Sequence, residues 1–239
     1  MEKQTSDIED KYMVCTRCYT YNHEHYIKDA LDGFAMQQTS FPVVTVVVDD
    51  ASTDKTPEVI RCYVAENFDL SSSDSYERDT DYAHITYAPH KTNKQCWFTV
   101  VYLKENHYSQ RKPKYLYIKE WLDDSKYFAI CEGDDYWNDP LKLQKQIQIL
   151  EKHNDCTMVL SNGFLFYEDK KITFPINPVS IKDSRYLTIS EVLREKGGMF
   201  PTASMCYRKA ILQDKPLFFN VPYVGDRPLR MWCAIHPWP

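Results

Sequence analysis

Glycine is scarce in this chain, with 6 in 239 residues, and long apolar runs are absent. The sequence therefore lacks the glycine-rich loop near the N-terminus that binds a pyrophosphate in many nucleotide-using enzymes. No stretch approaches the about 18 consecutive apolar residues of a membrane span. The opening segment, MEKQTSDIEDKY, is too polar for a secretion signal. We expect a cytoplasmic chain without a transmembrane segment.

Excess positive charge is also missing, since 29 Lys and Arg face 34 Asp and Glu and give a net charge of -5. This balance argues against nucleic acid as a general partner. Hydrophobic residues make up 43% and aromatic residues 14%, so we expect an ordered chain of one large or two small domains. We find no internal repeat.

The eight cysteines do not form the framework of a small disulfide-rich domain, so we expect reduced thiols. Cys15 and Cys18 lack a second ligand pair for zinc, and strand spacing directs their thiols to opposite faces. His23 and His25 are too close in sequence to bind one metal from a single helical face.

A run of β-branched residues at 43–48 predicts a buried parallel strand that ends at Asp49 and Asp50. Thr56 and Pro57 then supply an N-cap and a first-turn proline for a helix. A second strand, at 127–130, ends in the sequence CEGDDYW. Ligands bind beyond the carboxyl ends of strands in open α/β sheets, so both acidic ends should face one crevice.

The three carboxylates of Glu132, Asp134 and Asp135 repel one another unless a cation or a ring of donors offsets their charge. The pattern therefore favours a divalent-metal site for a phosphorylated ligand, and a solvated acidic turn is the simpler alternative. Gly133 lets the backbone approach a ligand closely.

Other elements follow from periodicity and turn signals. We expect a strand at 12–19, strands near 85–87 and 99–103, and a loop or excursion at 70–82. Helices are expected after Asn22 as a cap, at 115–122, and from Asp139-Pro140 onward. An Asn162-Gly163 turn predicts a hairpin between 158–161 and 164–167, and Gly33 is merely tolerated inside its helix.

Four motifs occur together in an order that resembles the family 2 glycosyltransferases. They are CYTYN at 18–22, VDDASTD at 48–54, EGDDYW at 132–137, and Gly225-Asp226. EGDDYW followed by DPLKL at 139–143 resembles bacterial members that build surface polysaccharides. The resemblance covers roughly residues 12–230.

The resemblance implies a GT-A fold, a Rossmann-like, mostly parallel α/β sheet flanked by helices. We expect a single domain over 1–239, with a nucleotide-sugar half at about 12–155 and a less regular acceptor-side half at about 156–239. Family members commonly continue with further helices, so we expect a truncated catalytic domain.

The resemblance also assigns roles to individual residues. Asp134 matches the metal ligand, and Asp226 matches the base that deprotonates the acceptor. Glu132 stands where the family usually has aspartate, which suits a ribose or water-mediated contact better than metal ligation. The nucleotide-sugar set is Thr20, Tyr21, Asn22, Asp49, Asp50, Glu132, Gly133 and Asp135. Thr202 and Ser204 border the acceptor, or simply form a loop-to-strand transition.

The implied reaction is inverting transfer of a sugar from a nucleotide-diphosphate sugar to a hydroxyl of a saccharide or lipid-linked saccharide, with Mg²⁺ or Mn²⁺ bound. Peripheral association with the inner face of the plasma membrane is compatible with it. A non-catalytic sugar-nucleotide-binding module and a receiver-like phosphoacceptor domain remain as alternatives. A sugar-nucleotide-forming enzyme is a weaker alternative, because the glycine-rich loop is absent.

Overall fold

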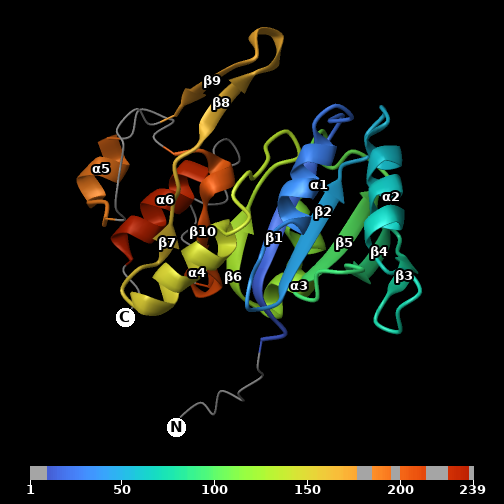
Figure 1. Cartoon of the computed structure of the whole chain (residues 1–239), viewed down its shortest axis with the longest axis horizontal. Coiled ribbons are helices and arrows are strands. Elements are labelled where there is room, and N and C mark those ends of the chain that lie inside the picture. The colour runs from blue at the N-terminus through green and yellow to red at the C-terminus, as the bar shows by residue number, and fades with distance from the viewer. Residues whose placement is uncertain (1–9, 177–184, 195–199, 214–225, 237–239) are drawn as a thin grey trace.

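A single eight-stranded sheet organises the chain, in the order β3-β4-β5-β2-β1-β6-β10-β7. The structure, a computed structural model, describes residues 10–176, 185–194, 200–213 and 226–236 (Figure 1). Gly225 and the glycines at 197 and 198 lie outside the described residues. The strands are β1 (Tyr12–Thr20), β2 (Val43–Asp49), β3 (Tyr76–Asp79), β4 (Ala83–Pro89), β5 (Cys96–Leu103), β6 (Ser125–Ile130), β7 (Met158–Val159) and β10 (Cys206–Arg208).

The four central strands, β5, β2, β1 and β6, run parallel. All seven residues of β2 are buried, because helices cover both faces of the sheet and β-branched side chains pack well there. Antiparallel strands extend the sheet at both edges. The predicted α/β class with a parallel centre is confirmed, and parallel pairing brings the carboxyl ends of β1, β2 and β6 to the same edge.

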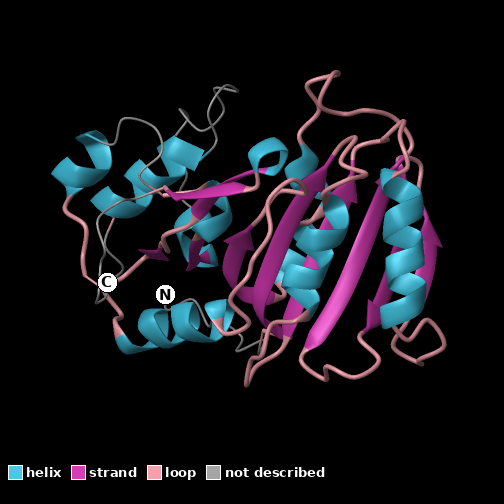
Figure 2. Cartoon of the chain, turned by 45° about the horizontal axis from the view of Figure 1, so that its top comes forward, coloured by secondary structure: helices cyan, strands magenta, loops and turns pink. Residues whose placement is uncertain are grey.

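Helices lie on both faces of the sheet, and each face has its own hydrophobic cluster (Figures 1 and 2). One face carries α1 (Ile27–Ala35), α2 (Thr56–Asn67) and α4 (Lys142–Lys152). The other carries α3 (Lys119–Asp123) and α6 (Asp226–Ile235). Cys15 packs in one cluster and Cys18 in the other, as strand alternation predicts, and all eight cysteines are free.

The last third of the chain is built from short elements. They are the hairpin β8 (Phe164–Tyr167) and β9 (Ile172–Pro175), helix α5 (Ile189–Arg194), and three 3-10 turns, η2 (Glu168–Lys170), η3 (Thr202–Ser204) and η4 (Lys209–Leu212). A further 3-10 turn, η1 (Lys114–Tyr117), precedes α3 in the middle of the chain. The hairpin projects away from the main sheet in Figure 1. None of the helices in the described ranges is long and apolar enough to span a bilayer.

Several local predictions were wrong. The hairpin pairs β8 with β9, while β7 pairs with β10, so Asn162-Gly163 does not join two paired strands. Residues 70–82, expected as a loop, contain β3. Asn22 does not cap α1, because the helix begins only at Ile27, where no side chain caps it.

The predicted helix starts are displaced by a few residues. Thr56 lies inside α2, and the Asp54 carboxylate accepts its backbone N–H at 2.9 Å. Helix α4 begins at Lys142 rather than at Pro140, with the Asp139 carboxylate accepting the N–H of Leu141 at 3.0 Å. In both places an aspartate upstream of the helix binds an N–H that no backbone carbonyl can reach.

Candidate active site at the carboxyl ends of β1, β2 and β6

Backbone hydrogen bonds join the three acidic or polar loops at one edge of the sheet. The N–H of Asp50, after β2, donates to the carbonyl of Thr20 at 3.0 Å. The N–H of Gly133, after β6, donates to the carbonyl of Tyr19 at 2.9 Å. The loop after β1 is thus fixed between the other two, and the sequence motifs meet as predicted.

Side chains lock the loops after β1 and β2 together. Asn22 donates its N–H to Ser52 Oγ at 2.9 Å, and its Oδ1 accepts the N–H of Thr53 at 2.8 Å. Asn22 and Ala51 both adopt left-handed backbone conformations, with φ of 56° and 58°. Such a conformation costs a non-glycine residue about 1–3 kcal/mol and is often found at functional sites.

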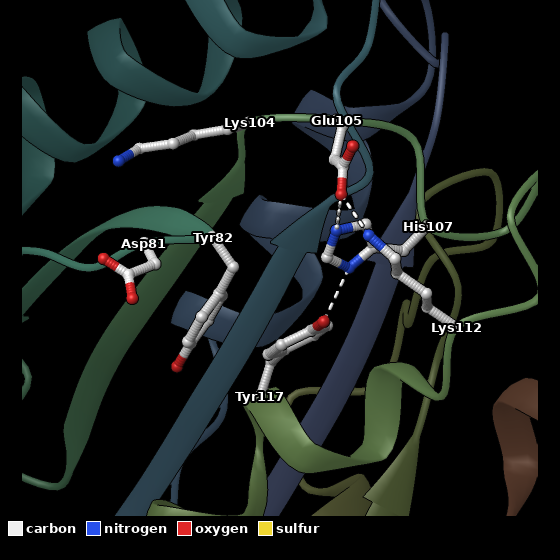
Figure 3. A pocket seen from close by; sticks show the side chains of 7 residues that line it. All are labelled: Asp81, Tyr82, Lys104, Glu105, His107, Lys112 and Tyr117. Atoms are coloured by element: carbon white, nitrogen blue, oxygen red, sulfur yellow. Dashed lines mark hydrogen bonds and ion pairs between the residues drawn. The ribbon is translucent and has the colours of Figure 1, made fainter.

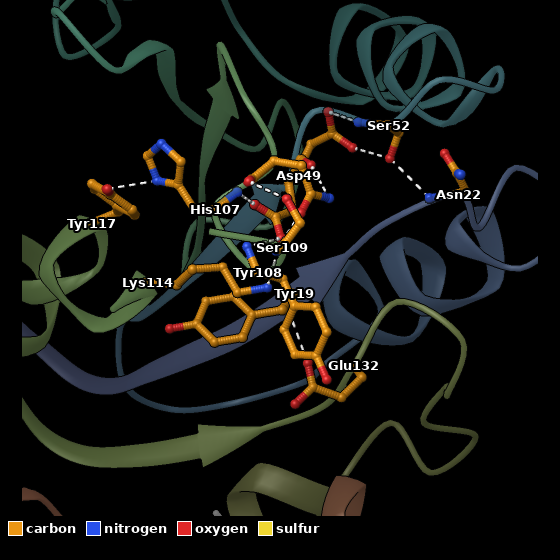
Figure 4. Close-up of polar contacts among 12 residues, drawn as sticks. Tyr19, Asn22, Asp49, Ser52, His107, Tyr108, Ser109, Lys114, Tyr117 and Glu132 are labelled. Carbon is orange, nitrogen blue, oxygen red and sulfur yellow. Dashed lines mark hydrogen bonds and ion pairs between the residues drawn. The ribbon is translucent and has the colours of Figure 1, made fainter. Parts of the chain in front are cut away.

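Asp49 and Asp50 both turn inward at the end of β2. Asp49 accepts hydrogen bonds from the backbone and hydroxyl of Ser52, and burial raises the pKa of its carboxyl. Asp50 is 0% exposed. Its Oδ1 accepts the N–H of His107 at 2.8 Å, and its Oδ2 accepts from Tyr108 N–H at 3.1 Å and from Lys114 Nζ at 3.0 Å (Figure 4).

These three hydrogen bonds, called the Asp50 clamp below, fix the segment 106–114 over the end of β2. The resemblance places Asp50 in the nucleotide-sugar set, where its carboxylate would accept from a base or ribose, but in the structure three internal donors bind this carboxylate. A receiver-like phosphoacceptor needs an accessible aspartate, so the burial of Asp50 also argues against that alternative. Tyr108, whose N–H belongs to the clamp, has a side chain that is 78% exposed.

Glu132 folds back onto β1 rather than outward. Its Oε1 pairs with Arg17 Nη2 and its Oε2 accepts the N–H of Tyr19 at 3.2 Å. The Arg17 guanidinium lies 4.3 Å from the centre of the Tyr19 ring. Glu132 therefore ties β6 to β1, which agrees with the expectation that it is a poor direct metal ligand.

The next residues of the acidic motif behave differently. The side chain of Asp134 is 55% exposed. Desolvation, and then the charges of Asp134 and Glu132, raise the pKa of Asp135, which shows the mutual repulsion expected from the sequence. A Cβ added to Gly133 would lie 2.6 Å from Thr20 Oγ1, so what approaches Gly133 closely is the Thr20 side chain.

Tyr136 and Trp137 have separate roles. Trp137 is buried and donates its Nε1–H to the carbonyl of Ala203 at 2.7 Å, whereas Tyr136 is exposed. Tyr21, in the loop after β1, is also exposed. Only the exposed rings are free to lie against a sugar.

The two residues expected beside the acceptor have different surroundings. Thr202 Oγ1 lies 3.3 Å from Asp226 Oδ2, so the structure brings this threonine and the predicted base together. Asp226 is the first residue of α6 and pairs with Arg230 Nη2 at 3.1 Å, one turn later. Ser204 is 2% exposed and lies in the core, which leaves its hydroxyl out of reach of an acceptor.

A pocket of about 510 Å³ lies beside this edge and contains none of the predicted residues (Figure 3). His107 lies between this pocket and the Asp50 clamp, with Nδ1 2.6 Å from Tyr117 OH and Nε2 3.3 Å from Glu105 Oε1. The lining residues are Asp81, Tyr82, Lys104, Glu105, His107, Lys112 and Tyr117.

Residues 19–77 match the model of glycosyl transferase family 2. The chain is also 33% identical over 207 residues to uncharacterized proteins of Mycobacterium tuberculosis and Mycobacterium bovis. Residues 19–77 thus carry the sequence of glycosyl transferase family 2. The alignment with the mycobacterial proteins covers 85% of this chain but 47% of each relative, so the chain spans about half the length of the curated relatives it matches.

Solved structures support the same fold. A crystal structure of S. aureus TarS is similar with a TM-score of 0.54 at 18% identity, covering 94% of this chain and 56% of that one. A second structure, of TarS in complex with UDP-GlcNAc, has a TM-score of 0.53 at 19% identity, with 93% and 53% covered. The fold of this chain is therefore GT-A, as the motifs predicted.

Sequence reasoning missed the partners of this site more than the site itself. Lys114, His107 and Tyr108 surround Asp50, but no motif or periodicity in the sequence singles them out. Arg17 was read only as part of a strand. A charged residue inside a buried strand is unusual, and this was the available signal that Arg17 pairs with an acidic residue.

Proposed function

We propose that this chain is a metal-dependent, inverting glycosyltransferase that uses a nucleotide-diphosphate sugar as donor. The observation that carries the proposal is the convergence of the loops after β1, β2 and β6 around one exposed carboxylate, Asp134. The TarS structure with UDP-GlcNAc supports a uridine diphosphate sugar as the donor class. The acceptor is a saccharide or lipid-linked saccharide hydroxyl in the synthesis of a bacterial surface polysaccharide.

The donor set at this edge fits a hard divalent cation. Within the described ranges, no three His, Cys, Asp or Glu side chains are grouped to hold a metal by themselves. Mg²⁺ and Mn²⁺ at nucleotide sites use one or two protein carboxylates, with phosphate oxygens and waters completing the shell. Asp134 would hold the ion, and the ion would offset charge on the departing diphosphate.

The remaining chemistry falls to Asp226. Its carboxylate would take the proton of the acceptor hydroxyl while the acceptor oxygen bonds to the anomeric carbon and the bond to the diphosphate breaks. Thr202 and Arg230 both contact Oδ2, which orients the carboxylate, and Oδ1 would accept the proton. Attack opposite the diphosphate inverts the anomeric carbon.

We also propose where the protein works. Nucleotide sugars are made in the cytoplasm, so the donor site has to face the cytoplasm. A lipid-linked acceptor would bring the protein to the inner face of the plasma membrane. The exposed apolar side chains of β8 and β9 suit a peripheral contact of this kind.

Donor binding and transfer test the proposal in separate measurements. Thermal unfolding with UDP-sugars should show stabilisation that requires Mn²⁺, and this stabilisation should be lost in Asp134→Ala but kept in Asp169→Ala, an exposed carboxylate on the hairpin. Asp226→Asn should retain donor binding and lose about 10²–10⁴-fold in transfer. Binding without any hydrolysis or transfer would instead indicate a non-catalytic sugar-nucleotide module.

A further inference from the structure

His23 lies beside Asp134 although the two are far apart in sequence. Its Nε2 is 3.9 Å from Asp134 Oδ2, and its side chain is 23% exposed against 55% for Asp134. The residue sits in the turn between β1 and α1, and its carbonyl accepts the N–H groups of Tyr26 and Ile27 at 2.9 Å. The backbone therefore fixes the position from which the imidazole reaches the acidic motif.

The distance between these two atoms suits two ligands of one cation. Ligands on an octahedral ion at about 2.1 Å lie about 3.0 Å apart when adjacent and about 4.2 Å apart when opposite. The separation of 3.9 Å is too long for adjacent ligands and close to the value for opposite ones, so a small movement of the exposed Asp134 side chain would bring the two atoms to the opposite spacing. A direct hydrogen bond between the two atoms would need about 2.7–3.2 Å, so the observed distance leaves room for an ion.

Thr20 and Gly133 set the orientation of the ring. Thr20 Oγ1 lies 3.2 Å from His23 Nδ1, so a proton on Nδ1 can be donated to the hydroxyl while Nε2 keeps its lone pair toward Asp134. Histidines that bind metals usually donate their other ring N–H in this way. A Cβ on Gly133 would lie 2.6 Å from Thr20 Oγ1 and 3.0 Å from His23 Nδ1, so only glycine leaves space for this pair.

One of the two other carboxylates of the motif is engaged elsewhere. Glu132 is bound to Arg17 and to the backbone of Tyr19. The imidazole of His23 then offers a nitrogen donor beside Asp134, from the loop after β1.

We propose that His23 is a ligand, through Nε2, of the divalent cation that Asp134 holds. This inference rests on the proposed metal-dependent function and adds to it a preference between metals. Mg²⁺ selects oxygen ligands, whereas an imidazole nitrogen is a better ligand for transition-metal ions. The chain should therefore bind Mn²⁺ more tightly than Mg²⁺ in the presence of UDP.

Pulsed electron paramagnetic resonance of Mn²⁺ with UDP tests the contact directly. The wild-type protein should show coupling of Mn²⁺ to an imidazole nitrogen, and His23→Ala should lose it. The Kd for Mn²⁺ should rise roughly tenfold or more in His23→Ala, with a smaller change for Mg²⁺. His25→Ala is the matched control, since His25 is 78% exposed and its Nε2 faces Glu24 at 3.4 Å.

The outcomes separate this inference from the function on which it rests. Thermal unfolding of the metal-free variants first shows that His23→Ala and a second variant, His23→Asn, are folded. If wild type binds Mn²⁺ and UDP but has no nitrogen coupling, or if both variants bind Mn²⁺ as wild type does, His23 is not a ligand and the proposed function stands. If wild type binds neither Mn²⁺ nor UDP, the proposed function itself is overturned.

Discussion

The strand ends at β2 and β6 are alike in sequence and opposite in structure. Each carries a pair of adjacent aspartates at or shortly after the end of a buried strand, and each precedes a helix. At the end of β2, Asp50 is fully buried and accepts three hydrogen bonds. At the end of β6, Asp134 is exposed and its neighbour Asp135 has a raised pKa because of desolvation and crowding.

The difference comes from the neighbouring strands. Strand β2 lies between β1 and β5, and the segment that follows β5 supplies the N–H groups and the lysine that surround Asp50. Strand β6 lies between β1 and the short antiparallel β10, whose neighbouring turn contributes no such donors to Asp134. One acidic end thus holds neighbouring segments together, and the other leaves Asp134 exposed to solvent.

A lysine near each strand end also differs in its partner: one pairs with a carboxylate, and the other, which is buried, bonds to an amide. Lys114 pairs with Asp50 at 3.0 Å. Lys142, on α4 beneath the acidic motif, is buried with its Nζ 2.8 Å from Gln146 Oε1 and 4.0 Å from the centre of the Trp137 ring. Desolvation lowers the pKa of Lys142 to about 8.

Replacing Asp50 should have the largest effect on stability. Asp50→Ala leaves Lys114 and two N–H groups without their acceptor in a buried setting, and breaking such a pair costs about 3–5 kcal/mol. Urea unfolding should show this loss, whereas Asp134→Ala should change the free energy of unfolding by no more than about 0.5 kcal/mol. Equal effects of the two substitutions would remove the contrast between the strand ends.

The sequence predicted the strands and missed the clamp for the same physical reason. The β-branched run of β2 and the helical spacing of Leu143, Ile147 and Leu150 are local signals, and all are confirmed. The hydrogen bonds from His107 and Lys114 to Asp50 span 57 and 64 residues. Nothing in the local pattern distinguishes a carboxylate that such a segment covers from one that stays open.

The hairpin was mispredicted because two cues competed. Asn162-Gly163 is a strong turn signal, but the turn that joins β8 to β9 is formed by 168–171, where Lys171 has a left-handed backbone with φ of 48°. Pairing of β7 with β10 joins segments nearly 50 residues apart and removes β7 from any local hairpin. Long-range pairing therefore overrode the local turn.

A pH titration of stability should reveal Lys142. Between about pH 8 and 10.5 the folded protein has released the proton from Lys142 while the unfolded chain still holds it. The unfolded state binds more protons in this window, so stability rises with pH, by at most about 3 kcal/mol. Lys142→Met should lose this rise, and the exposed Lys145→Met on the same helix should keep it. Parallel curves for wild type and Lys142→Met would show that Lys142 keeps an ordinary pKa.

Gly33 tests how α1 supports the β6 end. Helix propensity alone predicts that Gly33→Ala stabilises by about 0.5–1 kcal/mol. The structure predicts the opposite sign, because the new Cβ would lie 2.8 Å from the carbonyl oxygen and 2.9 Å from the nitrogen of Trp137. Overpacking against backbone costs about 1–3 kcal/mol. Thermal unfolding gives the sign, with Asp29→Ala on the exposed side of α1 as the control, and a stabilised Gly33→Ala would contradict the close packing.

Glu132 gives the smallest expected effect in this comparison. In sequence it belongs to the β6 end, which has the exposed Asp134, but its side chain is paired internally, as that of Asp50 is at the β2 end. Glu132→Gln removes the charge that faces Arg17, while the amide oxygen can still accept the N–H of Tyr19. We expect a loss of about 1 kcal/mol, since the pair is partly buried and hydrogen-bonded. Mn²⁺ binding with UDP should stay at the wild-type level, whereas Asp134→Asn should show the reverse pattern, with stability kept and Mn²⁺ binding lost.

A double-mutant cycle with Arg17→Met isolates the contribution of the Arg17–Glu132 pair to stability. If Glu132→Gln instead weakens Mn²⁺ binding without a loss of stability, Glu132 must leave Arg17 when the donor binds, and the strand end at β6 would then be open at all three of its carboxylates.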